Sequence, residues 1–260
     1  MSGFGQLARR LPDEIRQPLG RMVGLFQITI VRWLQGALFD LKGAIFRANG
    51  CTFSIPKDQT SRAYRSCFSN DSYEAEERAL VCELVRPTDT VLELGACLGI
   101  VSCVTNTLLA DKTKHVVVEG NPFCIPTLHR NRQRNGAGFL IENCAVSVAP
   151  DATFYLHPVY VVGGSTQRKS AFPVKVPSRS LTELAAGYGP FTTLIVDIEG
   201  AELEVFAEAT KVLEGVRLVI VELHDWAVGE SGVDRCREIL AAAGLRFRKR
   251  AGITEAWERG

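Results

Sequence analysis

Between residues 90 and 225 the sequence alternates short apolar runs with segments of helical spacing. The stretches 90–95, 115–120 and 217–223 each contain a short run made mostly of Val, Leu and Ile, which is typical of strands buried on both faces of a sheet. The segments that follow them carry apolar residues at the spacing of one helix face. This alternation predicts an α/β fold in which helices cover both faces of a mostly parallel sheet.

The end of the chain has a different pattern. Residues 245–259 read as two short strands with no helix between them. Two consecutive strands joined by a short turn pair antiparallel, whereas parallel neighbours need a long crossover. We therefore expect an antiparallel C-terminal hairpin at one edge of the sheet.

Polar residues stand where the apolar runs end. In open parallel sheets, ligands bind at the carboxyl ends of the strands. The residues at these ends are Glu93, Gly95, Glu119, Gly120, Asn143, Asp197, Glu199, Glu222 and His224. We expect them to form one site at this edge of the sheet.

The first part of the chain is basic and then apolar. Four arginines precede residue 22, and the apolar residues that follow fall near helical spacing. We predict an N-terminal helical extension over residues 1–50, broken near Gly36, ahead of a single domain at 51–260. No uncharged run approaches the roughly 18 residues that would span a bilayer.

Two interpretations of residues 21–46 stay open. An amphipathic helix there could pack on the main domain of the same chain. It could also pack on a second copy of the chain, and the protein would then be a homodimer. The arginines and Trp33 instead favour a helix that lies on a membrane surface. The second interpretation would place the protein at the inner membrane surface.

Charge and cysteine content exclude some classes of protein. The formal net charge is +1, so no global field attracts nucleic acid and no such partner is expected. None of the 8 cysteines forms a C-x-x-C pair, and several lie inside apolar runs. We expect reduced thiols and a cytoplasmic protein.

The first apolar run ends in a glycine turn, E-L-G-A-C-L-G, from Glu93 to Gly99. Gly95 and Gly99 permit a tight turn and the close approach of a ligand, and the next helix directs its free N–H groups to the same place. A dinucleotide site would have G-x-G-x-x-G, but Cys97 replaces the middle glycine, and Glu93 would repel a pyrophosphate. The turn favours a nucleoside ligand with a cationic part and no phosphate, such as S-adenosylmethionine.

Glu119 ends the second apolar run. An acid at this place can accept hydrogen bonds from both hydroxyls of a ribose. This role does not separate NAD from S-adenosylmethionine, and an acid at a strand end can also be a helix cap. The glycine turn, rather than Glu119, separates the two ligands.

Longer motifs extend these observations. The glycine turn, VEGNP at 118–122 and VDIEGAELEV at 196–205 occur in order, together with SYEAE, HRNRQRNG, NCAVS, VPSRSLTEL and VELHD. Over roughly residues 51–225 the chain resembles the FkbM family of S-adenosylmethionine-dependent methyltransferases. The D-x-E-G-x-E element that starts at Asp197 is the most specific match.

The resemblance implies a class I, Rossmann-like methyltransferase fold: a mostly parallel seven-stranded sheet with a reversed last strand. It implies a methyltransferase domain at 51–260, S-adenosylmethionine as cofactor, and a hydroxyl of a sugar, glycan or secondary metabolite as methyl acceptor. Three positions depart from the family pattern, where Glu93, Cys97 and Gly120 replace Asp, Asn and Pro. Compared with the Asn of the family pattern, Cys97 lacks a side-chain hydrogen bond to the cofactor.

Each cofactor residue has an expected role. Glu93 orients the amino-acid end of the cofactor, directly or through water, and Glu119 holds the ribose. Backbone groups of the glycine turn and of residues 143–145 contact the remaining parts. The expected cofactor-binding residues are Glu93, Gly95, Ala96, Cys97, Gly99, Glu119, Gly120, Asn121, Asn143, Cys144, Ala145 and Asp197.

Methyl transfer needs an acceptor oxygen held in line with the methyl group, which contributes up to about 7–11 kcal/mol. A general base adds about 10²–10⁴-fold. The expected catalytic residues are Asp197, Glu199, Glu222 and His224, with a near-neutral pKa making His224 a suitable base. We expect Glu202 at the N-terminus of the following helix, where the helix dipole stabilises an acidic side chain.

The same strand ends also carry residues of the types that bind divalent metal ions. Asp197, Glu222, His224 and Asp225 are metal-ligand types, but no spacing compels a metal and none is expected.

Three rival functions remain. N-methylation of an amino sugar or amine uses the same cofactor, and the acceptor pocket is expected in loops such as 157–178. A nicotinamide-dependent dehydrogenase is disfavoured by the glycine turn. A non-catalytic binding partner is disfavoured by the intact acids at Asp197, Glu199 and Glu222.

Overall fold

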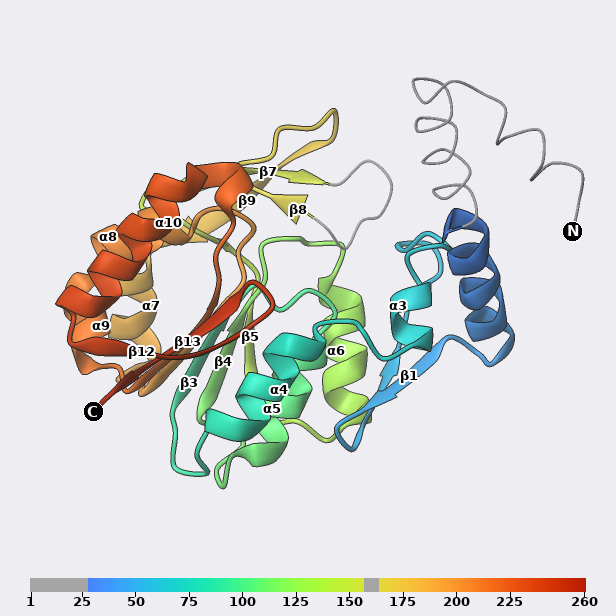
Figure 1. Ribbon diagram of the computed structural model, residues 1–260, viewed down its shortest axis with the longest axis horizontal. Helices are drawn as coiled ribbons and strands as arrows, with labels where there is room; N and C mark the ends of the chain where they lie inside the picture. The colour runs from blue at the N-terminus through green and yellow to red at the C-terminus, as the bar shows by residue number, and fades with distance from the viewer. Residues whose placement is uncertain (1–27, 157–163) are drawn as a thin grey trace, which may run out of the picture.

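A seven-stranded sheet forms the centre of the computed structural model, which describes residues 28–156 and 164–260 (Figure 1). The strand order is β12-β13-β11-β10-β3-β4-β5. The strands are β3 (Val91–Leu94), β4 (His115–Val118), β5 (Leu140–Glu142), β10 (Thr193–Val196), β11 (Leu218–Glu222), β12 (Leu245–Ala251) and β13 (Thr254–Arg259). β13 runs antiparallel to both its neighbours and all other pairs are parallel. The predicted fold class and C-terminal hairpin are confirmed.

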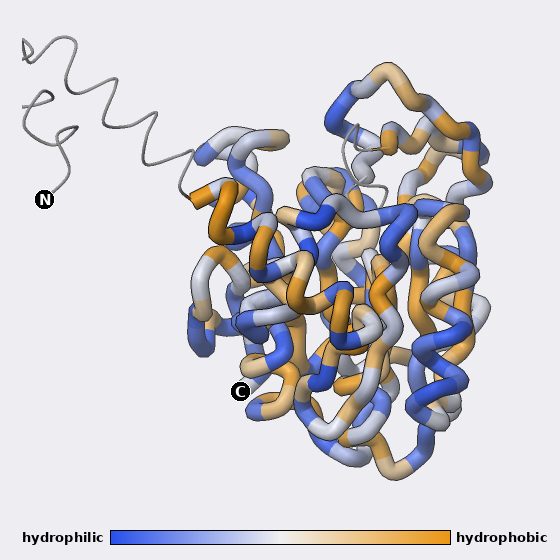
Figure 2. The backbone as a smooth tube through the Cα atoms, turned by 90° about the vertical axis from the view of Figure 1, so that its right-hand side faces the viewer, coloured by the Kyte–Doolittle hydropathy of each residue, from blue (hydrophilic) through white to orange (hydrophobic). Residues whose placement is uncertain are grey.

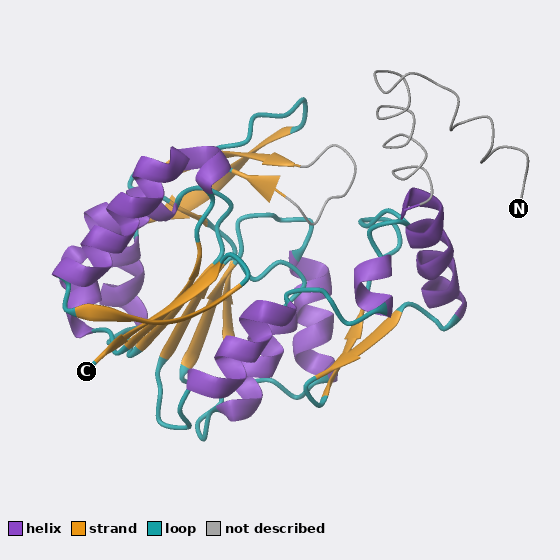
Figure 3. Ribbon diagram, viewed as in Figure 1, coloured by secondary structure: helices purple, strands orange, loops and turns teal. Residues whose placement is uncertain are grey.

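Helices cover both faces of this sheet (Figure 3). One face carries α4 (Ala75–Leu84), α5 (Ile100–Leu108) and α6 (Ile125–Arg134). The other carries α7 (Leu181–Tyr188), α8 (Glu202–Glu208), α9 (Thr210–Gly215) and α10 (Asp225–Ala242). Figure 1 shows the two groups on opposite sides of the strands.

The central strands are buried at every position because their side chains alternate between two cores. Val117, Ile195 and Ile220 pack on the side of α4 to α6, whereas Leu94 and Val196 pack on the side of α7 to α10. Burial of each such side chain contributes about 1.5–3 kcal/mol relative to exposure. The continuous apolar runs of the sequence follow from this two-sided burial.

A second sheet was not expected from the sequence. It has the order β6-β9-β7-β8 and consists of β6 (Ala145–Val146), β7 (Asp151–Leu156), β8 (Gly164–Ser165) and β9 (Pro173–Arg179). The expected loop at 157–178 is therefore partly strand, since β8 and most of β9 fall within it. Residues 157–163 lie outside the described residues.

The N-terminal extension is only partly helical. One continuous helix, here the N-terminal helix, spans residues 28–41. The predicted break at Gly36 is wrong. A Cβ at Gly36 would lie 1.8 Å from the carbonyl oxygen of Arg62, so the glycine serves close packing. Residues 1–27 lie outside the described residues.

After the N-terminal helix, the structure corrects the helical prediction up to residue 50. β1 (Ile45–Ala48) and β2 (Cys51–Ser54) form an antiparallel hairpin, and the short helix α3 (Ser66–Ser69) follows them in the chain. In β1 and β2, buried and more exposed residues alternate, which is the period of a strand on a half-buried surface.

The hairpin is tied to α6 by two asparagines. Asn131 Oδ1 accepts from the backbone N–H of Ser54 at 2.8 Å, and its Nδ2 donates to the carbonyl of Leu98 at 2.9 Å. Asn135 Oδ1 accepts from Thr52 N–H at 2.8 Å and its Nδ2 donates to Thr52 C=O at 2.9 Å. These side chains complete hydrogen bonds that a further strand would otherwise make.

The N-terminal helix exposes apolar side chains. Figure 2 shows hydrophobic segments along this helix, next to the grey trace. The exposed residues are Ile28, Ile30, Val31, Trp33, Leu34, Leu38 and Leu41. Asp40 fixes the end of the helix through Arg65, whose Nε and Nη2 donate to its carboxylate at 2.6 and 2.7 Å. Among the described residues, no helix is long and apolar enough to cross a membrane.

Asn131→Ala should lower the free energy of unfolding by at least about 2 kcal/mol, because buried backbone groups at Ser54 and Leu98 lose their partners. Gln133→Ala, an exposed position of the same helix, should change it by less than about 0.5 kcal/mol. Urea unfolding measures both. Equal small effects would show that the asparagine does not hold the hairpin.

Candidate active site

The glycine turn lies between the ends of β3, β4 and β10. The N–H groups of Gly95 and Ala96 both donate to the carbonyl of Val118, at 2.9 and 3.2 Å. Gly95 has φ +94°, and a Cβ there would lie 1.7 Å from the carbonyl oxygen of Asp197. Only glycine permits this approach, so the turn and the end of β10 are in direct backbone contact.

Glu119 joins the turn to the end of β4. Its Oε2 accepts from the N–H of Cys97 and its Oε1 from the N–H of Asn121, both at 2.6 Å. Burial raises the pKa of this carboxyl to about 7, although both hydrogen bonds lower it. Each carboxylate oxygen retains a lone pair for another donor.

Glu93 does not face the ligand side of the turn. The buried carboxylate accepts from Ser102 Oγ at 2.5 Å, and its other oxygen lies 3.2 Å from His115 Nε2. Its partners are therefore inside the fold, between β3, β4 and α5. The structure supports no direct cofactor contact by Glu93.

A cavity of about 530 Å³ opens at the carboxyl ends of the strands. Its lining includes these predicted cofactor residues: Gly95, Cys97, Glu119, Gly120, Asn121, Cys144, Ala145 and Asp197. Four other predicted residues do not line it: Glu93, Ala96, Gly99 and Asn143. Gly99 begins α5 with φ +77°, and Asn143 Nδ2 donates to the carbonyl of Glu119 at 2.7 Å. Gly99 and Asn143 therefore support the residues of the cavity wall without lining the cavity themselves.

The cavity is strongly acidic. The carboxylates in its lining belong to Glu74, Glu76, Glu119, Asp197, Glu199 and Glu222. No lysine, arginine or histidine lines it among the described residues. A ligand with phosphates would meet repulsion here, whereas a cationic ligand would be attracted.

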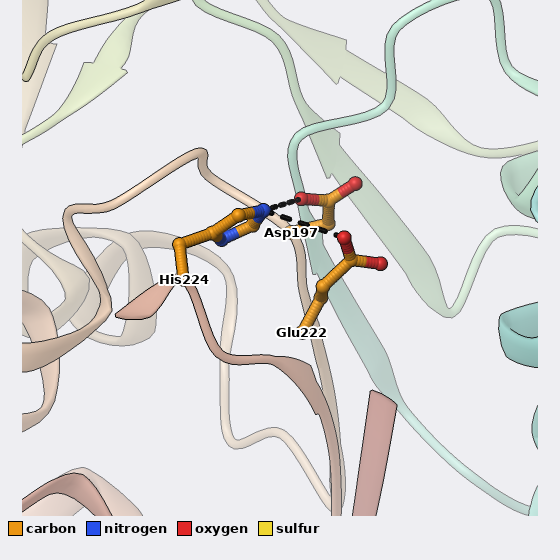
Figure 4. A group of neighbouring side chains, drawn as sticks. All are labelled: Asp197, Glu222 and His224. Atoms are coloured by element: carbon orange, nitrogen blue, oxygen red, sulfur yellow. Dashed lines mark ion pairs between the residues drawn. The ribbon is translucent and has the colours of Figure 1, made fainter. Parts of the chain in front are cut away.

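The four predicted catalytic residues come together in one group, the His224 cluster, which also contains Glu202. Figure 4 shows Asp197, Glu222 and His224 of this cluster. Nε2 of His224 lies 3.3 Å from Glu222 Oε1, 3.7 Å from Asp197 Oδ1 and 3.8 Å from Glu199 Oε2. On the other side of the ring, Nδ1 lies 2.8 Å from Oε1 of Glu202.

Chain turns bring these residues together. Asp197 and Glu199 follow β10, and the left-handed backbone at Glu199 (φ 52°) turns the chain, so both reach His224 although neither lies in an extended strand. Glu222 ends β11 and His224 precedes α10. Glu202 begins α8, but its main contact is His224, which the helix-terminus interpretation missed.

The prediction of a near-neutral pKa for His224 is wrong. Burial lowers the pKa of the imidazole, but hydrogen bonds to Glu202 and Glu222 and the charge of Asp197 outweigh burial and raise it to about 11. The ring is thus a cation at neutral pH and has no free lone pair for a proton. With the ring charged, a carboxylate of the cluster is the better base.

Burial and the neighbouring Glu222 raise the pKa of Asp197 well above its usual value, although the charge of His224 lowers it. Burial also raises the pKa of Glu199. A raised pKa brings a carboxylate closer to the range in which it accepts a proton efficiently. Asp197 Oδ1 is buried and accepts no hydrogen bond from the described residues.

Sequence reasoning did not place the other wall of the cavity. Tyr64, Tyr73 and Glu74 line it, together with Phe154 of the second sheet. From the sequence, Tyr73 and Glu74 of the SYEAE motif could either reach the substrate side or pack inside the fold, and the structure places both in the cavity lining. Burial raises the pKa of Glu74 to about 8, against the lowering effect of a hydrogen bond with Tyr73. Phe154 escaped notice because the second sheet was not expected.

The reversed last strand and a cavity at the carboxyl edge are the features of a Rossmann-like methyltransferase. Residues 93–247 match the sequence model of a family described as "Methyltransferase FkbM domain". Because this match covers more than half of the chain, the chain belongs to the FkbM methyltransferase family. No curated protein matches the chain.

Several solved structures are similar in fold. Precorrin-6y C5,15-methyltransferase from Geobacter metallireducens GS-15 has a TM-score of 0.47 and 10% identity, covering 80% of this chain and 94% of that one. M. jannaschii TYW2 in complex with AdoMet has a TM-score of 0.45 and 12% sequence identity, and the match covers 83% of this chain and 86% of that one. Aeropyrum pernix fibrillarin with natively bound S-adenosyl-L-methionine has a TM-score of 0.42 and 12% sequence identity, and the match covers 70% of this chain and 73% of that one. At these scores the likenesses assign no residue.

Gly95→Ala should lower the free energy of unfolding by at least about 3 kcal/mol. The new Cβ would collide with the carbonyl oxygen of Asp197, and the alanine backbone would be held in a left-handed conformation. Gly136→Ala is the matched control: φ is +58° there, but the Cβ meets nothing within 4 Å, so the loss should be about 1–2 kcal/mol. Urea unfolding of both variants separates the collision from the backbone strain. Equal losses would contradict the close contact at Gly95.

Proposed function

We propose that the chain transfers the methyl group of S-adenosylmethionine to an acceptor hydroxyl. One observation carries the proposal. A single acidic cavity joins the residues suited to a nucleoside, Gly95 and Glu119, to the His224 cluster. Cofactor and acceptor can therefore meet in one enclosed space.

The lining of the cavity fits this cofactor. The carboxylate of Glu119 can accept from the ribose hydroxyls while it keeps its two backbone bonds. The sulfonium and ammonium groups of S-adenosylmethionine are cations, and the acidic lining stabilises them. NAD carries a pyrophosphate instead, and no basic residue of the described lining would neutralise it.

The cluster residues supply the proton transfer. A lone pair of the acceptor oxygen forms the new bond to the methyl carbon, and the carbon–sulfur bond breaks with its electron pair remaining on sulfur. The hydroxyl proton passes to a carboxylate of the cluster, of which Asp197, Glu199 and Glu222 line the cavity. The sulfonium becomes a neutral thioether and one carboxylate becomes a carboxylic acid, so charge and atoms balance.

A polar small molecule is the acceptor that the walls fit best. Tyr64, Tyr73 and Phe154 offer apolar surface, while the carboxylates offer acceptors for hydroxyl groups. This mixture favours a sugar, a glycan or a hydroxylated secondary metabolite. The surplus of acids also supports the second candidate, methylation of an amino sugar, because an ammonium group would be attracted to the same cavity. Paired acceptors that differ only in hydroxyl and amine at one carbon distinguish the two.

Binding of S-adenosylhomocysteine should tighten as the pH rises through about 7. Glu119 must be ionised to hold the ribose, and its pKa is raised to about 7, so binding should weaken by up to about tenfold for each pH unit below this value. Glu119→Gln should bind at least about tenfold more weakly at pH 8 and lose most of this dependence. Calorimetric titration from pH 5.5 to 8.5 measures both.

Glu142→Gln is the control for this titration, because Glu142 ends the neighbouring strand β5 but does not line the cavity. It should keep the pH dependence of the unaltered chain. Glu74 also titrates near the cavity, with a pKa raised to about 8, so the difference between the variants isolates Glu119. Binding of NAD but not S-adenosylhomocysteine would refute the proposed function.

We also propose that the N-terminal helix binds an anionic membrane surface through its exposed apolar side chains, which would favour a lipid-linked glycan as acceptor. Substitution of Leu34 and Leu38, both exposed, by glutamine should reduce co-sedimentation with anionic vesicles by about tenfold or more. Val148→Gln, an exposed apolar position elsewhere, should leave it unchanged. Equal sedimentation of all three proteins would refute membrane binding, and a dimer lost on the same double substitution would assign the helix to a homodimer.

A further inference from the structure

We propose that the His224 cluster binds one divalent cation of the Mg²⁺ or Mn²⁺ class through Nε2 of His224 and the carboxylates of Asp197 and Glu222. The inference rests on the proposed methyl transfer and goes beyond it, because it adds a metal ion that the sequence analysis did not expect.

The three ligand atoms converge on one point. They all lie within 4.8 Å of one another, and Nε2 lies 3.3 Å from Glu222 Oε1 and 3.7 Å from Asp197 Oδ1. Adjacent ligands of an octahedral ion with bonds of about 2.1 Å are about 3 Å apart, so small side-chain rotations close the site. Figure 4 shows the side chains converging, with Asp197 from the end of β10 and with Glu222 and His224 from the segment between β11 and α10. Carboxylates suit Mg²⁺ or Mn²⁺, and imidazole is a common ligand of transition metals. The ion would take the place of the proton on Nε2, which leaves to solvent.

Glu202 provides an independent observation. It is fully buried, and its Oε1 lies 2.8 Å from Nδ1 of His224 and also accepts from Gly200 N–H at 3.0 Å. A carboxylate at Nδ1 orients the ring and directs Nε2 at the cluster, the arrangement that histidine ligands of metals usually have. Asp197 Oδ1, buried and without a hydrogen-bond donor among the described residues, faces the same Nε2.

The charge of the cavity also needs a cation. Three carboxylates face Nε2, and in the part of the chain that the structure describes only the His224 ring and Arg168, whose Nη2 lies 3.5 Å from Glu199 Oε2, form ion pairs with them. S-adenosylmethionine brings two positive groups but also a carboxylate. Repulsion among close carboxylates is unfavourable unless protons or cations offset it. A divalent cation would offset it without protonating the groups that must accept the hydroxyl proton.

The position gives the cation a role in catalysis. A hydroxyl oxygen bound to it would lose its proton more readily, because a divalent cation lowers the pKa of bound oxygen acids. Glu199, 3.8 Å from Nε2 and not required as a ligand, can take that proton. The oxygen then forms its bond to the methyl carbon as the carbon–sulfur bond breaks onto sulfur.

Titration of the full chain with MnCl₂, followed by the electron paramagnetic resonance signal of free Mn²⁺, tests the site. We expect one saturable Mn²⁺ per chain, displaced by excess Mg²⁺. Asp197→Asn and Glu222→Gln should each weaken binding at least tenfold. Pulsed spectra should show coupling to one histidine nitrogen, which His224→Gln abolishes.

Asp225→Asn is the matched control. It removes the same charge one residue from His224, but its side chain is exposed at the start of α10 and outside the cluster. It should bind Mn²⁺ like the unaltered chain. Absence of saturable Mn²⁺, absence of nitrogen coupling, or an equal loss in Asp225→Asn would overturn the proposal.

Binding of S-adenosylhomocysteine, measured in EDTA for each protein, separates the two proposals. Retained binding shows that a variant is folded. If the unaltered chain binds S-adenosylhomocysteine but no Mn²⁺, the metal site alone is refuted. If it binds no S-adenosylhomocysteine, the proposed methyl transfer fails, whatever the result with Mn²⁺.

Discussion

The site depends on the contact between the backbone of Gly95 and the carbonyl oxygen of Asp197. A side chain at Gly95 would occupy the place of that oxygen, 1.7 Å from it. Because the side chain is missing, the glycine turn after β3 packs directly against the end of β10. The turn also receives the carboxylate of Glu119 from the end of β4. Three strand ends are thereby locked together, and the nucleoside side of the cavity lies beside the His224 cluster.

This arrangement costs stability, because it buries carboxylates close to one another. The pKa of Glu119 is raised from about 4.5 to about 7, so the folded protein holds that proton more tightly than the unfolded chain. The stabilising effect of the proton is complete below the unfolded value and is lost as the pH rises through about 7. At neutral pH the empty cavity is thus strained electrostatically, and a cationic ligand relieves the strain. The same acids that weaken the free protein select the ligand.

Much of the architecture could be predicted from the sequence, for identifiable reasons. β3, β10 and β11 are buried on both faces and read as continuous apolar runs, and their ends collect the polar residues that line the cavity. The β1–β2 hairpin was missed because Phe46 continues the helical spacing of the preceding apolar residues, so that the segment of β1 was assigned to the N-terminal helical extension. The second sheet has short strands with few apolar residues, which give no clear period.

At the site, the sequence did not show the direction in which the side chains point. Glu93 stands at the end of β3, but it is in register with Val117 and Ile195 and points to the α5 side. There Ser102 and His115 hold it, and strand parity, rather than proximity to the turn, decides its role. The pKa of His224 depends on acids from β10, β11 and α8, whose convergence a sequence does not display.

The proposed function requires one cavity to hold S-adenosylmethionine with its reactive end at the His224 cluster. A crystal structure of the chain with S-adenosylhomocysteine tests this most directly. We expect both ribose hydroxyls within hydrogen-bond distance of the Glu119 carboxylate and the sulfur facing Asp197 and Glu222. A sulfur directed away from these residues, or a ribose that makes no contact with Glu119, would contradict it.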